Sequence, residues 1–294
     1  MSQLIQARSV RHEHGFDPAT QPVVPSSPLP ALPPASLQLE HIRQAFKRPV
    51  SWQIEPLFSR DFDVSGDVGQ AARQAAVLVP LVPRVDGLHV LLTRRAEHLH
   101  HHAGQVSFPG GCIEPTDPGP VDAAIRETRE EIGIERQYVR VMGAQPSLLT
   151  TTRFLMTPIV GELLPGFRVM PDASEVAEVF EVPLAVLMDP ARHVLHRMQV
   201  QYGEGRCYYS IRWGPHFIWG ATAMLIRNLY HFLAAAQAGP GLSGASINSP
   251  GSTGPQAAAQ PTGQARVRAP AAGGGSLSGP SAVDLAAGPW PGRQ

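Results

Sequence analysis

Apolar runs broken by turn residues dominate the middle of the chain and predict a sheet of several strands. Residues 75–82 are almost continuously apolar, which is typical of a largely buried strand. Asp86-Gly87 is a hairpin signal, and it leads into a second predicted strand at residues 88–93. The remaining predicted strands are at residues 139–143, 155–161, 176–182, 193–202 and 206–213.

Helical spacing of apolar residues predicts fewer helices than strands. The predicted helices are a short one within residues 37–59, one at residues 121–132 and one at about residues 219–236. In the middle helix Pro120 suits the first turn and Gly133 suits the end. Strands mixed with hairpins, together with helices near the middle and the end, predict an α/β sandwich in which helices cover a mixed sheet.

Both ends of the chain differ from this middle part. Residues 18–36 are rich in Pro, Ser and Ala without periodicity, and Gly, Ala, Pro, Ser and Gln dominate from Gly239 onward. Such segments bury too little apolar surface to offset the entropy of ordering them. The predicted organisation is a disordered Pro-rich segment at 1–37, an extension with a short helix and a loop at 38–70, a folded domain at 71–237 and a disordered tail at 238–294.

Charge and cysteine content narrow the class of protein. The formal net charge is zero, which gives no indication of a nucleic-acid or membrane-surface partner. Cys112 and Cys207 lie far apart and predict neither a disulfide framework nor a zinc site. Because the N-terminus lacks the apolar run of a signal peptide and no stretch is long enough to span a bilayer, we predict a cytoplasmic protein.

The middle helix carries the candidate chemistry. On a helical wheel Glu127, Glu130 and Glu131 cluster at one flank of the apolar face, and Arg126 and Arg129 fall on the opposite flank. A like-charge pair four residues apart costs an isolated helix roughly 0.2–0.5 kcal/mol. A hard divalent cation shared with substrate phosphates would relieve that repulsion. A solvated, salt-bridged face explains the same pattern, and the helix alone leaves both interpretations open.

The segment before this helix favours the metal interpretation, because glycines let a backbone approach a carboxylate-bound ion closely. Residues 111–134 resemble a Nudix box, which reads Gly, five residues, Glu, seven residues and Arg-Glu-U-x-Glu-Glu-x-Gly-U, where U is apolar. Residues 126–134 fit the second half, with Thr128 at an apolar position. Asp117 stands where Glu is expected, and eight residues separate it from Arg126. The resemblance implies a Nudix-type α/β/α sandwich.

This departure is similar to the coenzyme A diphosphatase branch of the family, and so is the segment before the box. Residues 91–111 read LLTRRAEHLHHHAGQVSFPGG, in which His100 replaces the usual Arg. Residues 175–184 and 218–223 also resemble that branch, and the resemblance covers about residues 71–233. It implies metal-dependent hydrolysis of coenzyme A or acyl-CoA to 3′,5′-ADP and 4′-phosphopantetheine or its acylated form.

The resemblance also implies roles for single residues. Glu127 and Glu131 bind Mg²⁺ or Mn²⁺, and Glu130 is a further ligand or the base that acts on water. Gly111 offers its carbonyl oxygen, and Arg126 orients Glu130 and steadies the loop. The substrate-binding candidates are Arg94, Arg95, His102, Gly104 and Gln105. The two arginines of this set are expected at the adenosine phosphates.

Alternatives remain at this stage. His98, His100, His101 and His102 suggest a transition-metal site, but no matching cysteine or acidic spacing accompanies them, so a loop that contacts phosphate or solvent is favoured. ADP-ribose or another nucleoside diphosphate derivative is the competing substrate. A nucleotide-sensing domain without catalysis would be expected to lose box glutamates, and this chain keeps all three. The expected partner is a small molecule, and a homodimer stays open.

Overall fold

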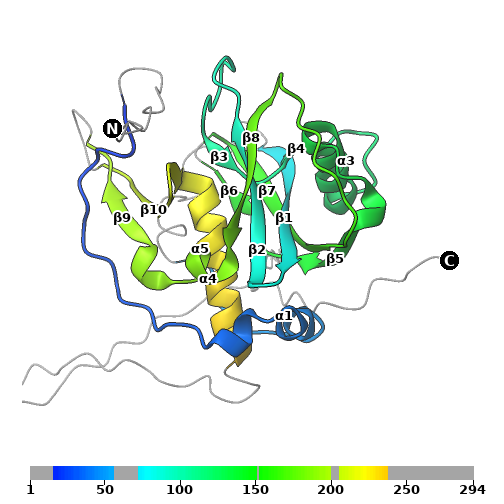
Figure 1. Cartoon of the computed structure of the whole chain (residues 1–294). Coiled ribbons are helices and arrows are strands. Elements are labelled where there is room, and N and C mark those ends of the chain that lie inside the picture. The colour runs from blue at the N-terminus through cyan, green and yellow to red at the C-terminus, as the bar shows by residue number, and fades with distance from the viewer. Residues whose placement is uncertain (1–15, 56–71, 151, 200–204, 238–294) are drawn as a thin grey trace, which may run out of the picture. The chain divides into compact units, whose positions relative to one another are not determined.

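A mixed sheet forms the centre of the described structure, with one long helix on each face (Figure 1). Helix α3 (Pro120–Ile132) covers one face and helix α5 (Gly220–Gln237) covers the other. The computed structural model describes residues 16–55, 72–150, 152–199 and 205–237. All of them belong to the unit formed by residues 1–239.

The central sheet has the strand order β3-β2-β1-β7-β5, and β8, β4 and β6 pair beside β2, β1 and β7. Strands β1 and β7 are parallel, and every other pair in this sheet is antiparallel. The bounds are β1 (Arg73–Arg84), β2 (Gly87–Arg95), β3 (Val106–Ser107), β4 (Gly110–Cys112), β5 (Val139–Ala144), β6 (Leu148–Leu149), β7 (Phe154–Leu163) and β8 (Val176–Pro183).

A small antiparallel sheet with the order β11-β10-β9 lies on the α5 side. Its strands are β9 (Val194–Arg197), β10 (Cys207–Trp213) and β11 (His216–Trp219). The other helical elements are α1 (Leu39–Phe46), α4 (Leu184–Leu187) and the 3₁₀ turns η2 (Pro34–Leu37), η3 (Arg136–Tyr138) and η4 (Pro190–Arg192). No helix of the described residues is long and apolar enough to cross a membrane.

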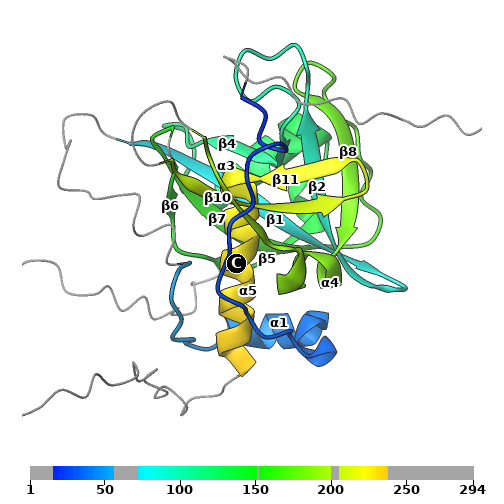
Figure 2. The same cartoon turned by 90° about the vertical axis from the view of Figure 1, so that its left-hand side faces the viewer.

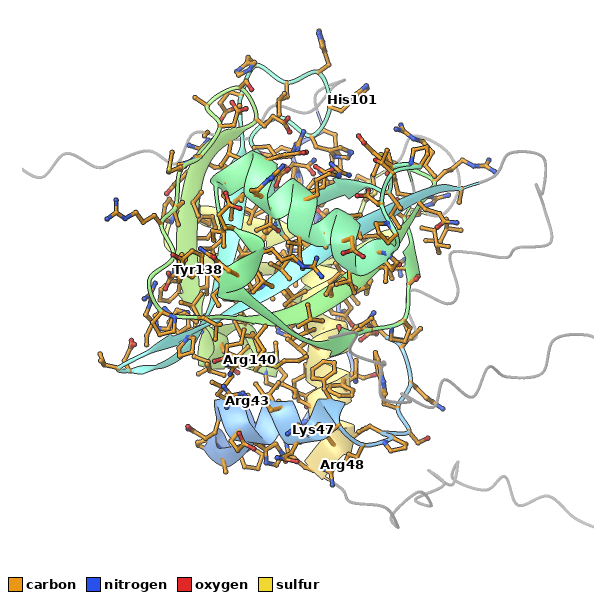
Figure 3. The ribbon with its side chains drawn as sticks, turned by 90° about the vertical axis from the view of Figure 1, so that its right-hand side faces the viewer. Arg43, Lys47, Arg48, His101, Tyr138 and Arg140 are labelled. Carbon is orange, nitrogen blue, oxygen red and sulfur yellow. The ribbon has the colours of Figure 1, made fainter. Side chains whose placement is uncertain are left out.

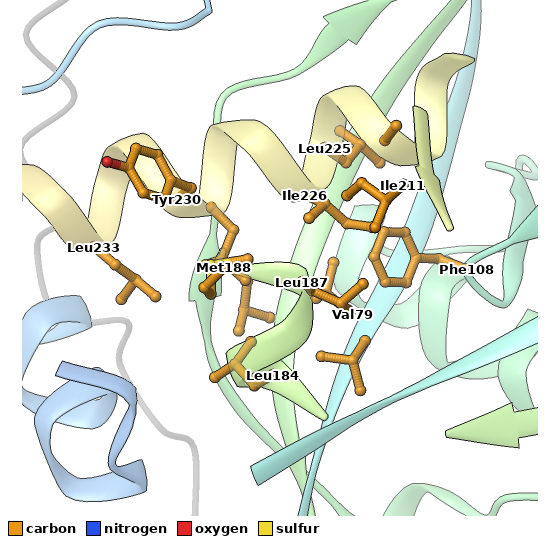
Figure 4. Packing of buried hydrophobic residues seen from close by; sticks show 14 of the residues in the cluster. Val79, Phe108, Leu184, Leu187, Met188, Ile211, Leu225, Ile226, Tyr230 and Leu233 are labelled. Carbon is orange, nitrogen blue, oxygen red and sulfur yellow. The ribbon is translucent and has the colours of Figure 1, made fainter. Parts of the chain in front are cut away.

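Strand β1 is the apolar centre of the fold. Residues 75–82 are buried without interruption, because helices cover the sheet on both faces. On one face Ala76 and Leu78 pack against the alanines of α3. On the other, Val77 and Val79 belong to the large core that α5 closes (Figure 4).

The structure confirms the α/β sandwich with a mixed sheet and most predicted elements. The hairpin after β1 forms as predicted, since Arg84 pairs with Gly87. The predicted strand at 193–202 is shorter, as β9, and residues 200–204 lie outside the described residues. Trp219 ends strand β11, and α5 begins one residue later at Gly220. The sequence pattern did not predict β3, β4, β6, β11 and α4.

The N-terminal segment differs from the prediction of disorder over residues 16–37. The Val24 N–H donates to the Leu195 carbonyl over 2.9 Å, and the Arg197 N–H donates to the Pro22 carbonyl over 3.0 Å. The segment adds to the free edge of β9, where the missing N–H of a proline is tolerated (Figure 1). The predictions for residues 1–15, 56–70 and 238–294 fall outside the described residues.

Helix α1 docks onto the sheet through a buried carboxylate. Arg43 of α1 and Arg140 of β5 lie beside each other (Figure 3), and both pair with Glu162, at 2.7 Å and 3.3 Å. Ile42 and Phe46 place the apolar face of the same helix against the core. The predicted short helix in the N-terminal extension is therefore part of the folded unit.

Candidate active site at the glycine turn and helix α3

The chain leaves β3 and enters β4 through Gly110 and Gly111, the glycine turn, and both positions require a residue without a side chain. Gly110 has φ +152°, and a Cβ there would collide with the Ala76 carbonyl and with Val77. A Cβ on Gly111 would lie 2.6 Å from the carboxylate of Glu127. The second glycine therefore makes room for an acidic side chain from α3.

Helix α3 brings its acidic flank to this turn because of how it starts, packs and ends. Pro120 occupies the first turn, and Gly133 ends the helix with φ +73°. Ala123 and Ala124 are completely buried against the sheet, which allows a close approach of the helix. The predicted helix at residues 121–132 is confirmed, and Pro120 is its first residue.

Glu131 is the most buried acid of the predicted set, with 4% of its surface exposed. Its Oε2 accepts a hydrogen bond from the Gly110 N–H over 3.1 Å, and its Oε1 lies 3.8 Å from Arg95. Burial raises the pKa of Glu131 to about 8, although the Gly110 N–H and Arg95 act in the opposite direction. The charges of Glu127 and Glu175 raise this pKa further.

Glu127 lies between the glycine turn and an arginine. Burial raises its pKa, the 3.1 Å contact with Arg126 opposes that shift, and the charges of Glu130 and Glu175 add to it. Two carboxylates with raised pKa values thus border the same turn. Both would be stabilised in the ionised form by an added positive charge.

Arg126 holds the loop before the helix. It binds both oxygens of Asp117, at 3.0 and 2.9 Å, and donates to the Cys112 carbonyl over 3.0 Å. Asp117, which stands where the box usually has Glu, therefore has its pKa lowered by this bidentate pair. Arg126 also donates to Glu130 over 2.9 Å, as the sequence predicted.

Glu130 is placed differently from the other two box glutamates. Its side chain is 48% exposed and points along the helix toward Arg126. Glu131 instead faces the interior beside Gly110. The sequence placed all three acids at the border of core and solvent, and the structure separates them into one buried, one half-buried and one exposed carboxylate.

The donor set fits a hard divalent cation that is shared with a substrate. Glu127 and Glu131 supply carboxylates on either side of the turn, and Gly111 leaves space between the turn and α3. Over the described ranges, no three histidine, cysteine, aspartate or glutamate side chains stand close enough to hold a metal by themselves. Mg²⁺ suits such a set, because it commonly takes one or two carboxylates and completes its shell with waters and phosphates.

The two predicted phosphate-binding arginines point to opposite faces of β2, because side chains alternate along a strand. Arg95 lies on the α3 face, beside Glu131. Arg94 lies on the α5 face, where it binds Glu178 over 3.1 Å and Glu97 over 2.8 Å. The structure therefore brings Arg95 to the site and leaves Arg94 away from it.

The loop after β2 returns to Arg95. The Arg95 N–H donates to the Gln105 carbonyl over 2.9 Å, and the Gly104 N–H donates to the Arg95 carbonyl. Gly104 has φ +68°, and His102, with φ +58°, contacts the Gln105 side chain over 3.0 Å. Three of the predicted substrate-binding residues thus form one tight turn that ends beside Arg95. His101 stands at the tip of the loop (Figure 3).

Glu175 is a candidate that the sequence reasoning did not assign to the site. Its carbonyl accepts a hydrogen bond from the Ala96 N–H over 2.8 Å, next to Arg95. Its charge raises the pKa of both Glu127 and Glu131. In the sequence, residues 175–184 only resemble the coenzyme A branch. No spacing rule connects Glu175 to the Nudix box, so the sequence alone could not assign it to the site.

Comparison with known proteins finds a matching family model and several similar proteins. A family model described as the NUDIX domain matches residues 72–198. An "Uncharacterized Nudix hydrolase NudL" of Salmonella paratyphi B is 44% identical over 160 residues, which cover 53% of this chain and 81% of the relative. One with the same name from an Enterobacter species is 40% identical over 158 residues, with the same coverage. The crystal structure of a Nudix hydrolase from M. smegmatis, RenU, aligns with 22% identity and a TM-score of 0.34, over 39% of this chain and 73% of that chain.

The α/β sandwich and the acidic helix beside a glycine turn define a class of hydrolases that act on small phosphorylated molecules. The chain belongs to the Nudix hydrolase family. Its reaction is accordingly the hydrolysis of a diphosphate bond.

Proposed function

We propose that the chain cleaves the diphosphate bond of coenzyme A or an acyl-CoA, giving 3′,5′-ADP and 4′-phosphopantetheine or its acylated form. The observation that carries this proposal is the position of residues 91–111. This segment resembles the coenzyme A branch, and its Arg95 lies beside Glu131 at the glycine turn. A resemblance that continues into the site itself is more informative than one confined to the box.

Glu127, Glu131 and the Gly111 carbonyl would hold Mg²⁺ or Mn²⁺, with Glu130 as a further ligand or a base. When bound, such an ion neutralises phosphate charge and lowers the pKa of an attacking water. The Gly110 N–H keeps Glu131 pointed at the turn. Glu127 is held on its other side by Arg126.

Two arginines of the chain have separate roles in the proposed reaction. The Arg95 guanidinium lies 3.8 Å from Glu131, beyond hydrogen-bond distance, and its buried Nε has no partner among the described residues, so its terminal amino groups would be the ones to bind a diphosphate oxygen. We assign the phosphate contact to Arg95 rather than Arg94, because two carboxylates already pair with Arg94. Arg126 donates to Glu130 over 2.9 Å and orients its carboxylate, which is exposed enough to accept a proton from water. His102, Gly104 and Gln105 shape the turn beside Arg95.

A second candidate within the same chemistry is ADP-ribose or another nucleoside diphosphate derivative, since the site's diphosphate-binding groups do not distinguish among these molecules. A nucleotide-sensing role without catalysis is less favoured, because Glu127, Glu130 and Glu131 are all present and two of them border the turn. A single hydrolysis assay with several substrates distinguishes these two alternatives from the coenzyme A proposal.

The test is a panel of coenzyme A, acetyl-CoA and ADP-ribose with Mg²⁺ or Mn²⁺, with products separated by chromatography. We expect coenzyme A to yield the two named products, and Glu127→Gln or Glu131→Gln to lower kcat at least ~100-fold, which is beyond the effect of losing a ligand's supporting residue. Glu135→Gln, an exposed acid just past the helix, is the matched control and should be unaffected.

Each outcome of the panel decides between the candidates. Much faster hydrolysis of ADP-ribose would reject the coenzyme A assignment and retain the family's reaction. Full activity of either glutamine variant, or activity after exhaustive chelation, would reject the metal assignment. Binding of a nucleotide without turnover of any substrate would favour the sensing role.

A further inference from the structure

The first turn of α5 is bonded to the strand that leads into the glycine turn. The Thr222 hydroxyl donates to the Val106 carbonyl over 2.9 Å, and Thr222 is only 9% exposed. Gly220, with φ +61°, makes the sharp change of direction from β11 into α5 that places Thr222 there. Thr222 lies in residues 218–223, a motif singled out in the sequence that the box chemistry leaves unused.

Two further contacts hold the chain after Val106. Phe108 points into the core against Ile211 and Ile226 (Figure 4). The next carbonyl, that of Pro109, accepts a hydrogen bond from the Leu78 N–H of β1 over 2.9 Å. Thr222 is thus the first of a series of contacts that fix the backbone immediately before the two glycines.

The position of this backbone decides whether the glycine turn fits the acidic helix. The Gly110 N–H must face Glu131, and Gly111 must leave room for Glu127, and both contacts tolerate little displacement. A strand as short as β3, with only two paired residues, fixes its own position weakly. A side-chain hydrogen bond from a helix therefore adds a restraint that the short strand alone lacks.

We propose that Thr222 is a positioning residue for the active site, whose hydroxyl fixes β3 so that the glycine turn meets Glu127 and Glu131. The proposal rests on the proposed function in that these residues form the metal site. It assigns a task to the motif at 218–223, which lies outside the box and on the opposite face of the sheet. The alternative is a hydrogen bond that contributes to stability alone.

The decisive experiment compares Thr222→Val, which removes the hydroxyl at nearly constant shape, with Thr222→Ser, which keeps the hydroxyl. Tyr230→Phe is the matched control, because it removes another hydroxyl of α5 that donates to a backbone carbonyl, that of Pro30, far along the helix. Two readouts need no substrate. They are hydrogen–deuterium exchange of the peptide covering residues 104–112, and Mn²⁺ affinity measured by electron paramagnetic resonance.

We expect Thr222→Val to speed exchange of that peptide and to weaken Mn²⁺ binding roughly 10-fold, in the range found for groups that support metal ligands. Thr222→Ser should stay within about 2-fold of the wild type. Tyr230→Phe should lower the melting temperature without changing either readout. With a hydrolysed substrate, Thr222→Val should raise the half-saturating Mg²⁺ concentration more than it raises KM.

Wild-type exchange and Mn²⁺ affinity in Thr222→Val would overturn the proposal. Equal losses of Mn²⁺ affinity and of exchange protection in Thr222→Val and Tyr230→Phe would overturn it too. They would show that the Thr222 hydroxyl contributes to stability alone. If Thr222→Val does not fold, Thr222→Ala with the same readouts decides the question. Failure of the wild type to cleave coenzyme A would reject the proposed substrate, while the two substrate-free readouts would still judge Thr222.

Discussion

Glu131 is an acid held where its ionised form is costly. Its carboxylate is buried between α3 and the glycine turn, with one backbone N–H and a distant Arg95 as partners. A buried carboxylate without a close cation destabilises the fold when it is ionised. Such groups are common at functional sites, where a bound ligand or metal stabilises the charge. Its titration therefore provides a direct test of the site.

The first prediction concerns stability against pH in the presence of a chelator. The folded pKa of Glu131 is about 8, above the ordinary 4.5, so the folded state holds the proton more tightly and stability falls as pH rises toward 8. Between pH 6.5 and 8 this amounts to about 2 kcal/mol, or about 4–8 °C in Tm. Calorimetry should show this loss in the wild type and not in Glu131→Gln.

Adding Mg²⁺ at pH 8 should restore the lost Tm of the wild type, because a ligand that binds only the folded state stabilises it. The same addition should leave Glu131→Gln nearly unchanged. A wild type whose Tm is flat from pH 6.5 to 8 in chelator would contradict the burial of this carboxylate.

The second prediction uses two glycines that differ in what surrounds them. Gly111→Ala places a Cβ 2.6 Å from the Glu127 carboxylate and should displace it, lowering kcat at least ~10-fold. At Gly119 a Cβ meets nothing within 4 Å, and φ is close to 175°, so Gly119→Ala should keep wild-type activity. Initial-rate measurements on both variants test this prediction. Equal rates would show that the close approach of Gly111 and Glu127 is not needed for activity.

At the scale of elements, a buried polar cluster ties the N-terminal extension to α5. Glu55 accepts hydrogen bonds from Arg227 over 2.7 Å and from His231 over 2.9 Å, and its N–H donates to Asn228 over 3.1 Å. Arg227 also contacts His193 over 3.2 Å. Burial lowers the pKa of His193 to about 4, so this ring is neutral near pH 7 and can accept from Arg227.

The third prediction follows from this cluster. Arg227→Met leaves Glu55 buried without its main cation, which typically costs 3–5 kcal/mol, or about 6–20 °C in Tm. Arg140→Met removes the more exposed of the two arginines that pair with Glu162, which keeps Arg43, and should cost at most about 1 kcal/mol. Thermal unfolding measures both, and similar losses would indicate that the buried cluster contributes no more than one exposed arginine.

The same cluster should make the fold sensitive to acid. His193 has a lowered pKa, so the unfolded state binds its proton first, and stability is lost as pH falls from 6.5 toward 4. Between about pH 4.5 and 6.5 this loss opposes the gain in stability from Glu131, whose effect extends from pH 4.5 to 8. Repeating the pH series in Glu131→Gln therefore isolates the contribution of His193.

At the scale of the whole folded unit, residues 16–24 cover the outer face of the small sheet. Phe16 lies against Tyr208 and Trp219, and the Tyr208 hydroxyl donates to the Pro18 carbonyl over 2.6 Å. The blue segment in Figure 2 follows this sheet and then α5. Phe16, Pro18 and Pro22 therefore have partners that lie far away in the sequence.

The fourth prediction is a comparison of two truncations. Removing residues 2–24 should lower Tm by several degrees and increase binding of a hydrophobic dye, because the backbone bonds to β9 and the cover over Tyr208 are lost. Removing residues 240–294, a Gly- and Pro-rich stretch, should leave Tm and turnover nearly unchanged. A wild-type Tm in the first variant would refute the role of the N-terminal segment, and a collapse in the second would refute the composition argument.

Much of the fold was predictable because the apolar pattern is strong where burial is symmetrical. Strand β1 reads as continuously apolar since both of its faces are covered, and α3 reads as amphipathic with a proline at its start and a glycine at its end. The short strands β3, β4 and β6 escaped prediction, because two or three residues carry no period. Residues 16–37 escaped it because their partners in β9, β10 and α5 are distant in sequence.

The sequence by itself determined which element carries the chemistry, since the spacing of Glu127, Glu130 and Glu131 on a helix follows from local geometry alone. Only the tertiary structure decided that Glu131 is buried, that Arg95 and not Arg94 reaches it, that the charge of Glu175 acts on it, and that Thr222 bonds to β3. The physical reason is that burial and contact depend on which surfaces meet. Local pattern determines a helix or a strand, and packing then determines which of its side chains face a charge.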